Sequence, residues 1–293
     1  MIVNSREALA TLARALPLVL FRAGFFVAGG FMVLVLFGML LFVARQIGGV
    51  RPVTAVLVAL SALLGWWASG RVLQRYFLYR HRAAMLLCFS GRPSAAAGLA
   101  AAIKESKRLV PDHVRWAYLN GAARRALFSF TRGSKELAGP GNVHRPRGFS
   151  RTLDLLAVPP LSQAVLTLAF ERGSAKGERS VREALALCFD YGQESRRMAR
   201  AWLVFSAAGQ FFLFLCLAFP NWFFFKSAGA PVWIGVLLAA VIARVLHQAF
   251  VTPLVLAGVS GSLLAETRDH IPDPKVCEKL TVLFPDQASE NEH

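Results

Sequence analysis

The chain has 293 residues, a net charge of +16 and only 17% charged residues, while 55% of its residues are hydrophobic. An ordinary soluble domain has about 25% charged residues, so this composition excludes that class and favours a membrane protein with its apolar residues in blocks. The basic charge flanks these blocks, where it orients membrane spans. We therefore expect lipid headgroups, and no nucleic acid, among its partners.

Residues 1–22 are predicted to form an N-terminal amphipathic helix. Ser5 is a suitable N-cap. Four leucines follow at helical spacing: Leu9, Leu12, Leu16 and Leu20. Such a helix lies on the inner surface of the membrane. The alternative is that it forms only the cytoplasmic start of the first span.

Residues 23–70 are predicted to form a transmembrane hairpin. Its first span, residues 23–44, has no charged residue. At about 1.5 Å per residue, this span is long enough to cross a hydrocarbon core of about 30 Å. The second span, residues 52–70, has Trp66 and Trp67 near its inner end, and tryptophan favours the headgroup level.

Residues 71–200 are predicted to form a basic helical region. The region has 23 Lys and Arg against 9 Asp and Glu. A basic loop between spans marks the cytoplasmic side of a membrane. The sequence pattern predicts helices over residues 93–109, 111–131 and 177–198.

Residues 153–170 are largely apolar but short for a full crossing, and Pro159 and Pro160 interrupt them. If they crossed together with residues 111–131, the basic loop 133–148 would lie outside, against the positive-inside pattern. We therefore favour a re-entrant or interfacial segment whose backbone is broken at the proline pair. A double crossing is the alternative.

Residues 201–265 are predicted to form a second transmembrane hairpin. Its first helix ends at the aromatic residues 222–225, which suit the outer interface. Its second helix starts at Val232 and is predicted to kink at Pro253. Residues 266–293 are predicted to form a weakly acidic cytoplasmic tail, which can dock a basic partner.

Three polar residues of the predicted fourth span are candidates for a functional site. Arg244, His247 and Gln248 are spaced i, i+3 and i+4, so they share one face of a helix. Ionisable residues inside a span are candidates for function, here lining a path for an anion. The alternative is that Arg244 only extends its long side chain to the cytoplasmic interface.

Three further residues complete this candidate intramembrane site. Asp154 is the only carboxylate near the membrane segments before Glu171, and we expect it to pair with the Arg244 face. Arg22, near the inner end of the first span, can join an anion-binding cluster. Gln210, in the third span, either lines a polar path or bonds a neighbouring helix.

The sequence has no motif that indicates an enzyme. It lacks a glycine-rich phosphate loop, an HExxH zinc motif and a GxSxG serine motif. Its four cysteines have no metal-binding spacing, and cytoplasmic thiols stay reduced: Cys88, Cys188, Cys216 and Cys277. We therefore expect no catalytic residue, metal, cofactor or disulfide.

The layout of helical hairpins that flank cytoplasmic helices, with the late segment FVTPLVL at residues 250–256, resembles the choline-transporter-like and sulfate-permease-like membrane proteins. The resemblance covers about the second half of the chain. It assigns no functional residue.

These patterns together predict an all-α polytopic membrane protein with four transmembrane helices in two hairpins. A cytoplasmic or interfacial helical layer lies between the hairpins, and both termini are cytoplasmic. We expect a non-enzymatic subunit of the cell inner membrane that anchors or scaffolds a larger assembly through this basic layer and the tail. The alternative is a transporter or channel for an anionic solute or lipid. Expected partners are anionic lipid headgroups and other protein subunits or further copies of the chain.

Overall fold

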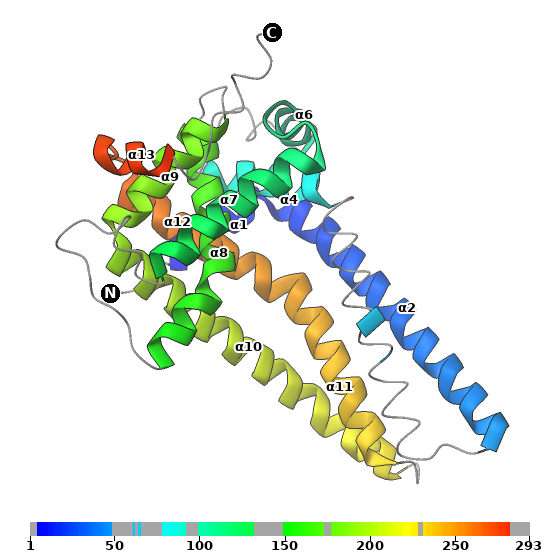
Figure 1. The fold of residues 1–293 in the computed structure, drawn as a ribbon. Helices are drawn as coiled ribbons and strands as arrows, with labels where there is room; N and C mark the ends of the chain where they lie inside the picture. The colour runs from blue at the N-terminus through cyan, green and yellow to red at the C-terminus, as the bar shows by residue number, and fades with distance from the viewer. Residues whose placement is uncertain are drawn as a thin grey trace. The chain divides into compact units, whose positions relative to one another are not determined.

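The computed structural model describes residues 5–48, 61, 64–65, 78–91, 99–131, 149–172, 177–227 and 231–281. All regular elements in these stretches are helices, which confirms the predicted all-α class (Figure 1). The helices divide into two compact units. The basic unit comprises residues 1–16, 79–205 and 254–293, and the apolar unit comprises residues 17–78 and 206–253.

Three described helical stretches are long and apolar enough to cross a membrane, which supports a helical membrane protein. They are Thr152–Arg172, Glu194–Ser227 and Val232–Thr267. The first predicted span, residues 23–44, lies within α2 (Leu16–Gly48). The second predicted span, residues 52–70, falls almost wholly outside the described residues.

The N-terminal segment forms two helices where the sequence predicted one. α1 (Ser5–Arg14) ends in a turn at Ala15, whose N–H donates to the Leu12 carbonyl at 3.1 Å, and α2 follows. Three of the four predicted leucines are exposed, namely Leu9 by 58%, Leu16 by 47% and Leu20 by 56%. Exposed leucines of this kind are what an interfacial helix places against lipid.

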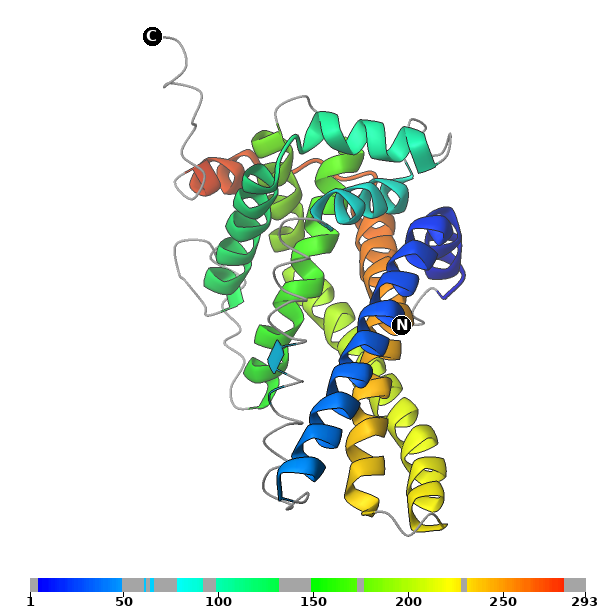
Figure 2. The same ribbon diagram turned by 90° about the vertical axis from the view of Figure 1, so that its right-hand side faces the viewer.

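The basic unit is built around α8 (Phe149–Arg172), which contacts α4, α7 and α9 (Figure 2). The other helices of this unit are α4 (Tyr79–Ser90), α6 (Leu99–Leu109), α7 (His113–Thr131), α9 (Gly177–Asp190), the start of α10 (Gly192–Ser227), most of α12 (Thr252–Thr267) and α13 (Pro274–Thr281). Residues 161–170 of α8 are all buried. Protein therefore covers most of the apolar surface of α8, with 72% of its most apolar window buried.

α8 runs unbroken through its proline pair, which corrects the predicted interruption. Because proline has no N–H, the carbonyls of Leu155 and Leu156 lose their helical hydrogen bonds. Leu156 and Pro159 are exposed, so this part of α8 has one side that the rest of the unit does not cover. On the other side, Ser162 Oγ donates to the Pro159 carbonyl at 2.8 Å.

The helices predicted between the two hairpins are largely confirmed as helices. α6 and α7 fall within the predicted ranges 93–109 and 111–131, with residues 92–98 outside the described part. The predicted helix at 177–198 is instead divided into α9 and α10. The break is a turn at Tyr191, whose N–H donates to the Leu187 carbonyl at 3.1 Å.

The helices of the apolar unit pack closely through glycine. The unit contains most of α2, the later part of α10, α11 (Val232–Leu246) and the π-helical turn η1 (His247–Val251). A Cβ atom added at Gly30 would lie 2.7 Å from the Val245 side chain, and one added at Gly235 would lie 2.9 Å from the Asn221 carbonyl oxygen. Small residues at such positions allow the close helix approach typical of membrane proteins.

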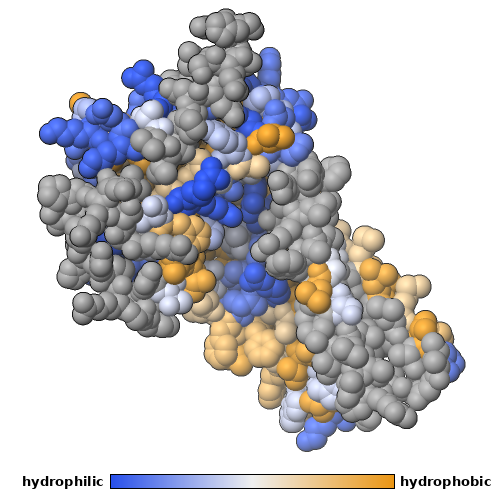
Figure 3. All heavy atoms as spheres, in the orientation of Figure 1, coloured by the Kyte–Doolittle hydropathy of each residue, from blue (hydrophilic) through white to orange (hydrophobic). Residues whose placement is uncertain are grey.

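The outward faces of α10 and α11 are apolar. α10 and α11 run side by side in both ribbon views, and Figure 3 shows hydrophobic side chains over them. Only 6% of the most apolar window of α10 is buried. By contrast, hydrophilic side chains gather over α9 and α13 of the basic unit (Figure 3).

The predicted fourth span is one apolar stretch made of α11, η1 and α12. Its predicted kink near Pro253 coincides with the π-helical turn His247–Val251. The backbone N–H of Thr252 bonds the His247 carbonyl, and the Thr252 hydroxyl donates to the same carbonyl at 3.2 Å. A single π-helical turn of this kind is often found at a functional site, and here it contains a histidine.

Candidate functional site

Two polar residues of the apolar unit, Ser206 and His247, meet at η1. His247 Nε2 lies 2.9 Å from Ser206 Oγ and 3.0 Å from the Ser206 carbonyl oxygen. Because a carbonyl only accepts, Nε2 carries the proton, and Nδ1 of the neutral ring is an acceptor. His247 is only 6% exposed, and its buried Nδ1 has no hydrogen-bond partner among the described residues.

Gln210 supplies a second buried acceptor in the same unit. It lies one turn beyond Ser206 on α10, on the same helical face. Two antiparallel contacts, Ser206 with His247 and Asn221 with Gly235, set the register of α10 against α11 and η1 and place Gln210 near the level of His247. Gln210 Oε1 is buried and has no hydrogen-bond partner in the described part of the chain.

These two acceptors define what the cluster can bind. An unsatisfied buried acceptor costs about 1–3 kcal/mol, so each favours a hydrogen-bond donor. A water molecule or a substrate hydroxyl meets this need with the ring neutral. If the ring is protonated, Nδ1 becomes a donor and can hold an anion.

The other two residues of the predicted face differ from His247 in burial. Arg244 is exposed, whereas Gln248 is half-buried. The long Arg244 side chain therefore extends away from the buried cluster, as expected of an arginine that reaches for an interface. The structure brings His247 together with Ser206, and it leaves the exposed Arg244 outside this pair.

Arg22 lies on the part of α2 that packs against η1. Its neighbours Ala23 and Phe26 form a buried cluster with Ala249 of η1. Arg22 is 6% exposed, and its guanidinium lies 5.2 Å from the centre of the Phe26 ring, within range of a cation–π interaction. The sequence places no Asp or Glu in residues 17–78 or 206–253, so the charged residues of the apolar unit are all Lys or Arg.

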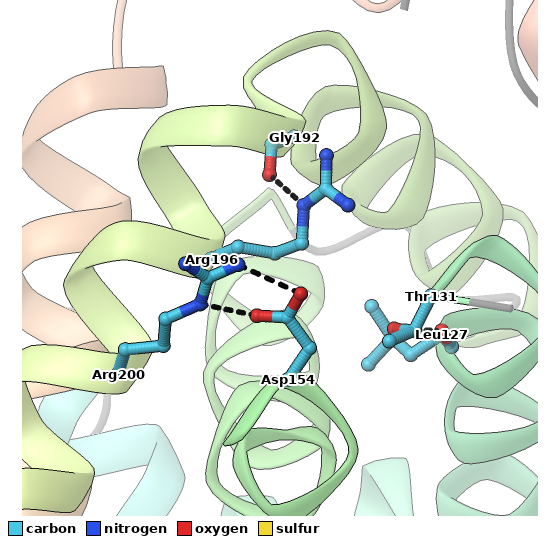
Figure 4. A network of polar contacts seen from close by, with 6 residues as sticks. All are labelled: Leu127, Thr131, Asp154, Gly192, Arg196 and Arg200. Carbon is cyan, nitrogen blue, oxygen red and sulfur yellow. Dashed lines mark hydrogen bonds and ion pairs between the residues drawn. The ribbon is translucent and has the colours of Figure 1, made fainter. Parts of the chain in front are cut away.

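Asp154 belongs to the basic unit, where its partner is Arg200 and not the predicted Arg244 face (Figure 4). Arg200 forms a two-pronged ion pair with Asp154, through Nε to Oδ1 and through Nη2 to Oδ2 at 2.7 Å. Asp154 is 2% exposed. A planar guanidinium matches a carboxylate in this way, so the pair fixes α8 against α10.

Arg196 completes the network around Asp154, one turn before Arg200 on α10 (Figure 4). Its Nε donates to the Gly192 carbonyl at 2.8 Å, and its guanidinium lies 5.2 Å from the centre of the Phe130 ring. Thr131 does not serve the carboxylate, because its hydroxyl donates to the Leu127 carbonyl at 2.7 Å. Sequence reasoning missed both arginines, although their i, i+4 spacing places them on one helical face.

The described residues contain no cluster of His, Cys, Asp and Glu that could hold a metal ion. The four cysteines are free thiols. Burial raises the pKa of Cys188 to about 12, and burial also raises the pKa of Cys88. Thiols in this state are protonated at neutral pH and are poor nucleophiles.

Comparisons with known proteins returned no relatives. No protein-family model, no curated protein and no solved structure matches this chain. The class that the fold defines is therefore a helical protein with apolar helices long enough to span a membrane, and its function has to be argued from its own residues.

Proposed function

We propose that the protein is a non-enzymatic subunit of the cell inner membrane that anchors a larger assembly. In this proposal the apolar unit contributes four spans in two hairpins, and both termini are cytoplasmic. The basic unit is the cytoplasmic layer that meets partner proteins and anionic headgroups. The observation that carries the proposal is the contrast between the two units.

The apolar unit has the surface of an anchor. Phe211, Phe219 and Phe224 of α10 are exposed by 62%, 70% and 67%. Burial of one such side chain contributes about 1.5–3 kcal/mol, so this surface favours lipid or a neighbouring apolar helix. The close glycine contacts of Gly30 and Gly235 favour a rigid support.

The basic unit has the surface of a docking layer. It has its own buried core around α8, so it does not depend on lipid to cover its apolar residues. Arg108 and Arg179 are exposed by 71% and 74%, and Arg125 on α7 is exposed as well. Surface cations of this kind attract acidic partners and anionic headgroups.

Purification in nanodiscs cut from native membranes, followed by mass spectrometry, tests this proposal. We expect a protein partner in a fixed ratio to the chain. The partner should be lost from the triple variant Arg108→Glu, Arg125→Glu and Arg179→Glu. Lys226→Glu changes an exposed charge at the other end of α10, and this variant should retain the partner. A chain that purifies without any protein partner in every preparation contradicts the proposal.

A second candidate function is transport of an anionic solute. The observation that favours it is that Arg22 and His247 are buried in a unit whose sequence contains no carboxylate. Proteoliposomes loaded with radiolabelled phosphate or sulfate test it. We expect His247→Ala to reduce flux at least tenfold and Lys226→Ala to leave flux unchanged. Absence of flux by the wild-type protein above empty liposomes would leave the anchor as the better proposal.

A further inference from the structure

Two helices of the basic unit bring arginines together without any carboxylate of their own. α4 contains Arg80 and Arg82, and α7 contains Arg115, Arg124 and Arg125, but neither helix has an Asp or Glu. α4 packs against α7. Arg82 and Arg124 are both half-buried, and they interact electrostatically across this contact. The contact therefore places two positive charges together where water screens them poorly.

The Arg82 guanidinium is incompletely satisfied. Its Nε atom is buried and has no hydrogen-bond partner among the residues that the structure describes. Arg82 lies where α4 enters the core, since residues 83–90 are all buried. A guanidinium has five N–H donors in a fixed plane, so a buried Nε indicates a place for an acceptor.

The electrostatic setting of Arg82 favours the same conclusion. Burial, and then the nearby positive charge of Arg124, lower the pKa of Arg82 to about 10. Both effects disfavour the charged form. An anion beside the two guanidinium groups would oppose both effects.

Three carboxylates on or beside the helices around α4 have partners of their own. Asp154 of α8 is held by Arg200, and Glu105 of α6 pairs with Arg108 at 2.8 Å. Asp112, just before α7, accepts from the backbone N–H of Arg115 at 2.6 Å. Each of these three carboxylates is therefore engaged by another group, and none of the three satisfies the Arg82 Nε atom.

We propose that Arg82 and Arg124 form a binding site for a phosphate group. Phosphate oxygens accept two parallel N–H bonds from a guanidinium, and a phosphate has oxygens for two arginines at once. By sequence, α4 begins at Tyr79, nine residues after the predicted second span ends at residue 70. This position is near the expected headgroup level, so the phosphate group comes either from an anionic phospholipid or from free phosphate.

Thermal unfolding of the detergent-purified full chain tests the site, with inorganic phosphate titrated against sodium chloride at constant ionic strength. We expect a saturable rise in the unfolding midpoint of about 5 °C for the wild type. Arg82→Gln, Arg82→Met and Arg124→Gln should each abolish the rise. Arg125→Gln removes the same charge from an exposed position on α7 and should retain it.

Native mass spectrometry of protein extracted from membranes distinguishes the two sources. One retained anionic phospholipid, lost in Arg82→Gln but kept in Arg125→Gln, supports a headgroup site. A phosphate response without retained lipid supports a site for free phosphate. An equal phosphate response in all variants, or no response in the wild type, overturns the proposal. Two different replacements of Arg82 guard against one variant that fails to fold.

Discussion

At the level of single residues, Asp154 is the buried carboxylate whose environment is best defined. Its side chain has no exposed surface, it pairs with the guanidinium group of Arg200, and the positive charge of Arg196 is near enough to interact with it electrostatically. Removal of one partner from a buried ion pair leaves the other charge uncompensated, which costs about 3–5 kcal/mol. We therefore expect Asp154→Asn to lower the free energy of unfolding by about this amount in denaturant titrations.

The matched comparisons for this prediction come from the same unit. Glu183→Gln removes the surface partner of Arg179 and should cost less than about 1 kcal/mol. The double variant Asp154→Asn with Arg200→Gln should recover part of the loss, because neither charge is then left alone. Equal costs for the Asp154 and Glu183 variants would show that the Asp154 pair contributes no more than a surface pair.

Thiol chemistry gives a second prediction at this scale. Burial raises the pKa of Cys188 to about 12, and burial followed by nearby carboxylates raises the pKa of the half-buried Cys277. Since only the thiolate reacts, a raised pKa lowers the alkylation rate at pH 8. In the folded protein we expect iodoacetamide to modify Cys277 at a rate that rises about tenfold for each unit of increasing pH below its pKa. Cys188 should not be modified at all. Peptide mass spectrometry after timed quenching measures both, and rapid modification of Cys188 at pH 8 would contradict its burial.

At the level of helices, a glycine sets the distance between α10 and α12. A Cβ atom added at Gly258 would overlap the Trp202 ring, whereas one added at Gly24 of α2 would meet nothing within 4 Å. Overpacking costs about 1–3 kcal/mol, so Gly258→Ala should lower the unfolding midpoint. Gly24→Ala should leave it unchanged or raise it, because alanine favours a helix by about 1 kcal/mol over glycine. Thermal unfolding of both variants in one detergent provides the comparison, and equal midpoints would refute close packing at Gly258.

The helices also show what the sequence could and could not predict. Apolar blocks and helical spacing predicted α7, α10 and the stretch from α11 to α12, because these signals are local. The proline pair wrongly predicted a break in α8. A rule based on local sequence does not include tertiary packing, and one side of this helix is exposed and tolerates lost hydrogen bonds. The π-helical turn at His247 has no sequence signature of its own.

The candidate site was harder to predict than the helices. His247 and Gln210 were recognised because polar residues are rare in apolar helices. The Asp154–Arg200 pair joins residues 46 apart in sequence, and only tertiary packing shows that this carboxylate belongs to the basic unit. Spacing within one helix could not reveal a partner on another.

At the level of the whole molecule, the membrane topology depends on whether α8 crosses the membrane. By length and composition it could cross a membrane, yet 72% of its most apolar window is buried by protein. A helix covered by its own unit gains little from lipid, because protein already buries its apolar surface. We therefore expect α8 to remain on the cytoplasmic side with α7 and α9.

Single cysteines placed in a cysteine-free background test this topology. Arg125→Cys on α7 and Arg179→Cys on α9 flank α8, and both positions are exposed. In sealed inner-membrane vesicles, a membrane-impermeant maleimide should label both from the cytoplasmic face and label Lys226→Cys only from the opposite face. If α8 crosses, the labels at Arg125→Cys and Arg179→Cys will appear on opposite faces. That result would favour a double crossing over the cytoplasmic helical layer, and the positive-inside pattern would then fail for the loop at residues 133–148.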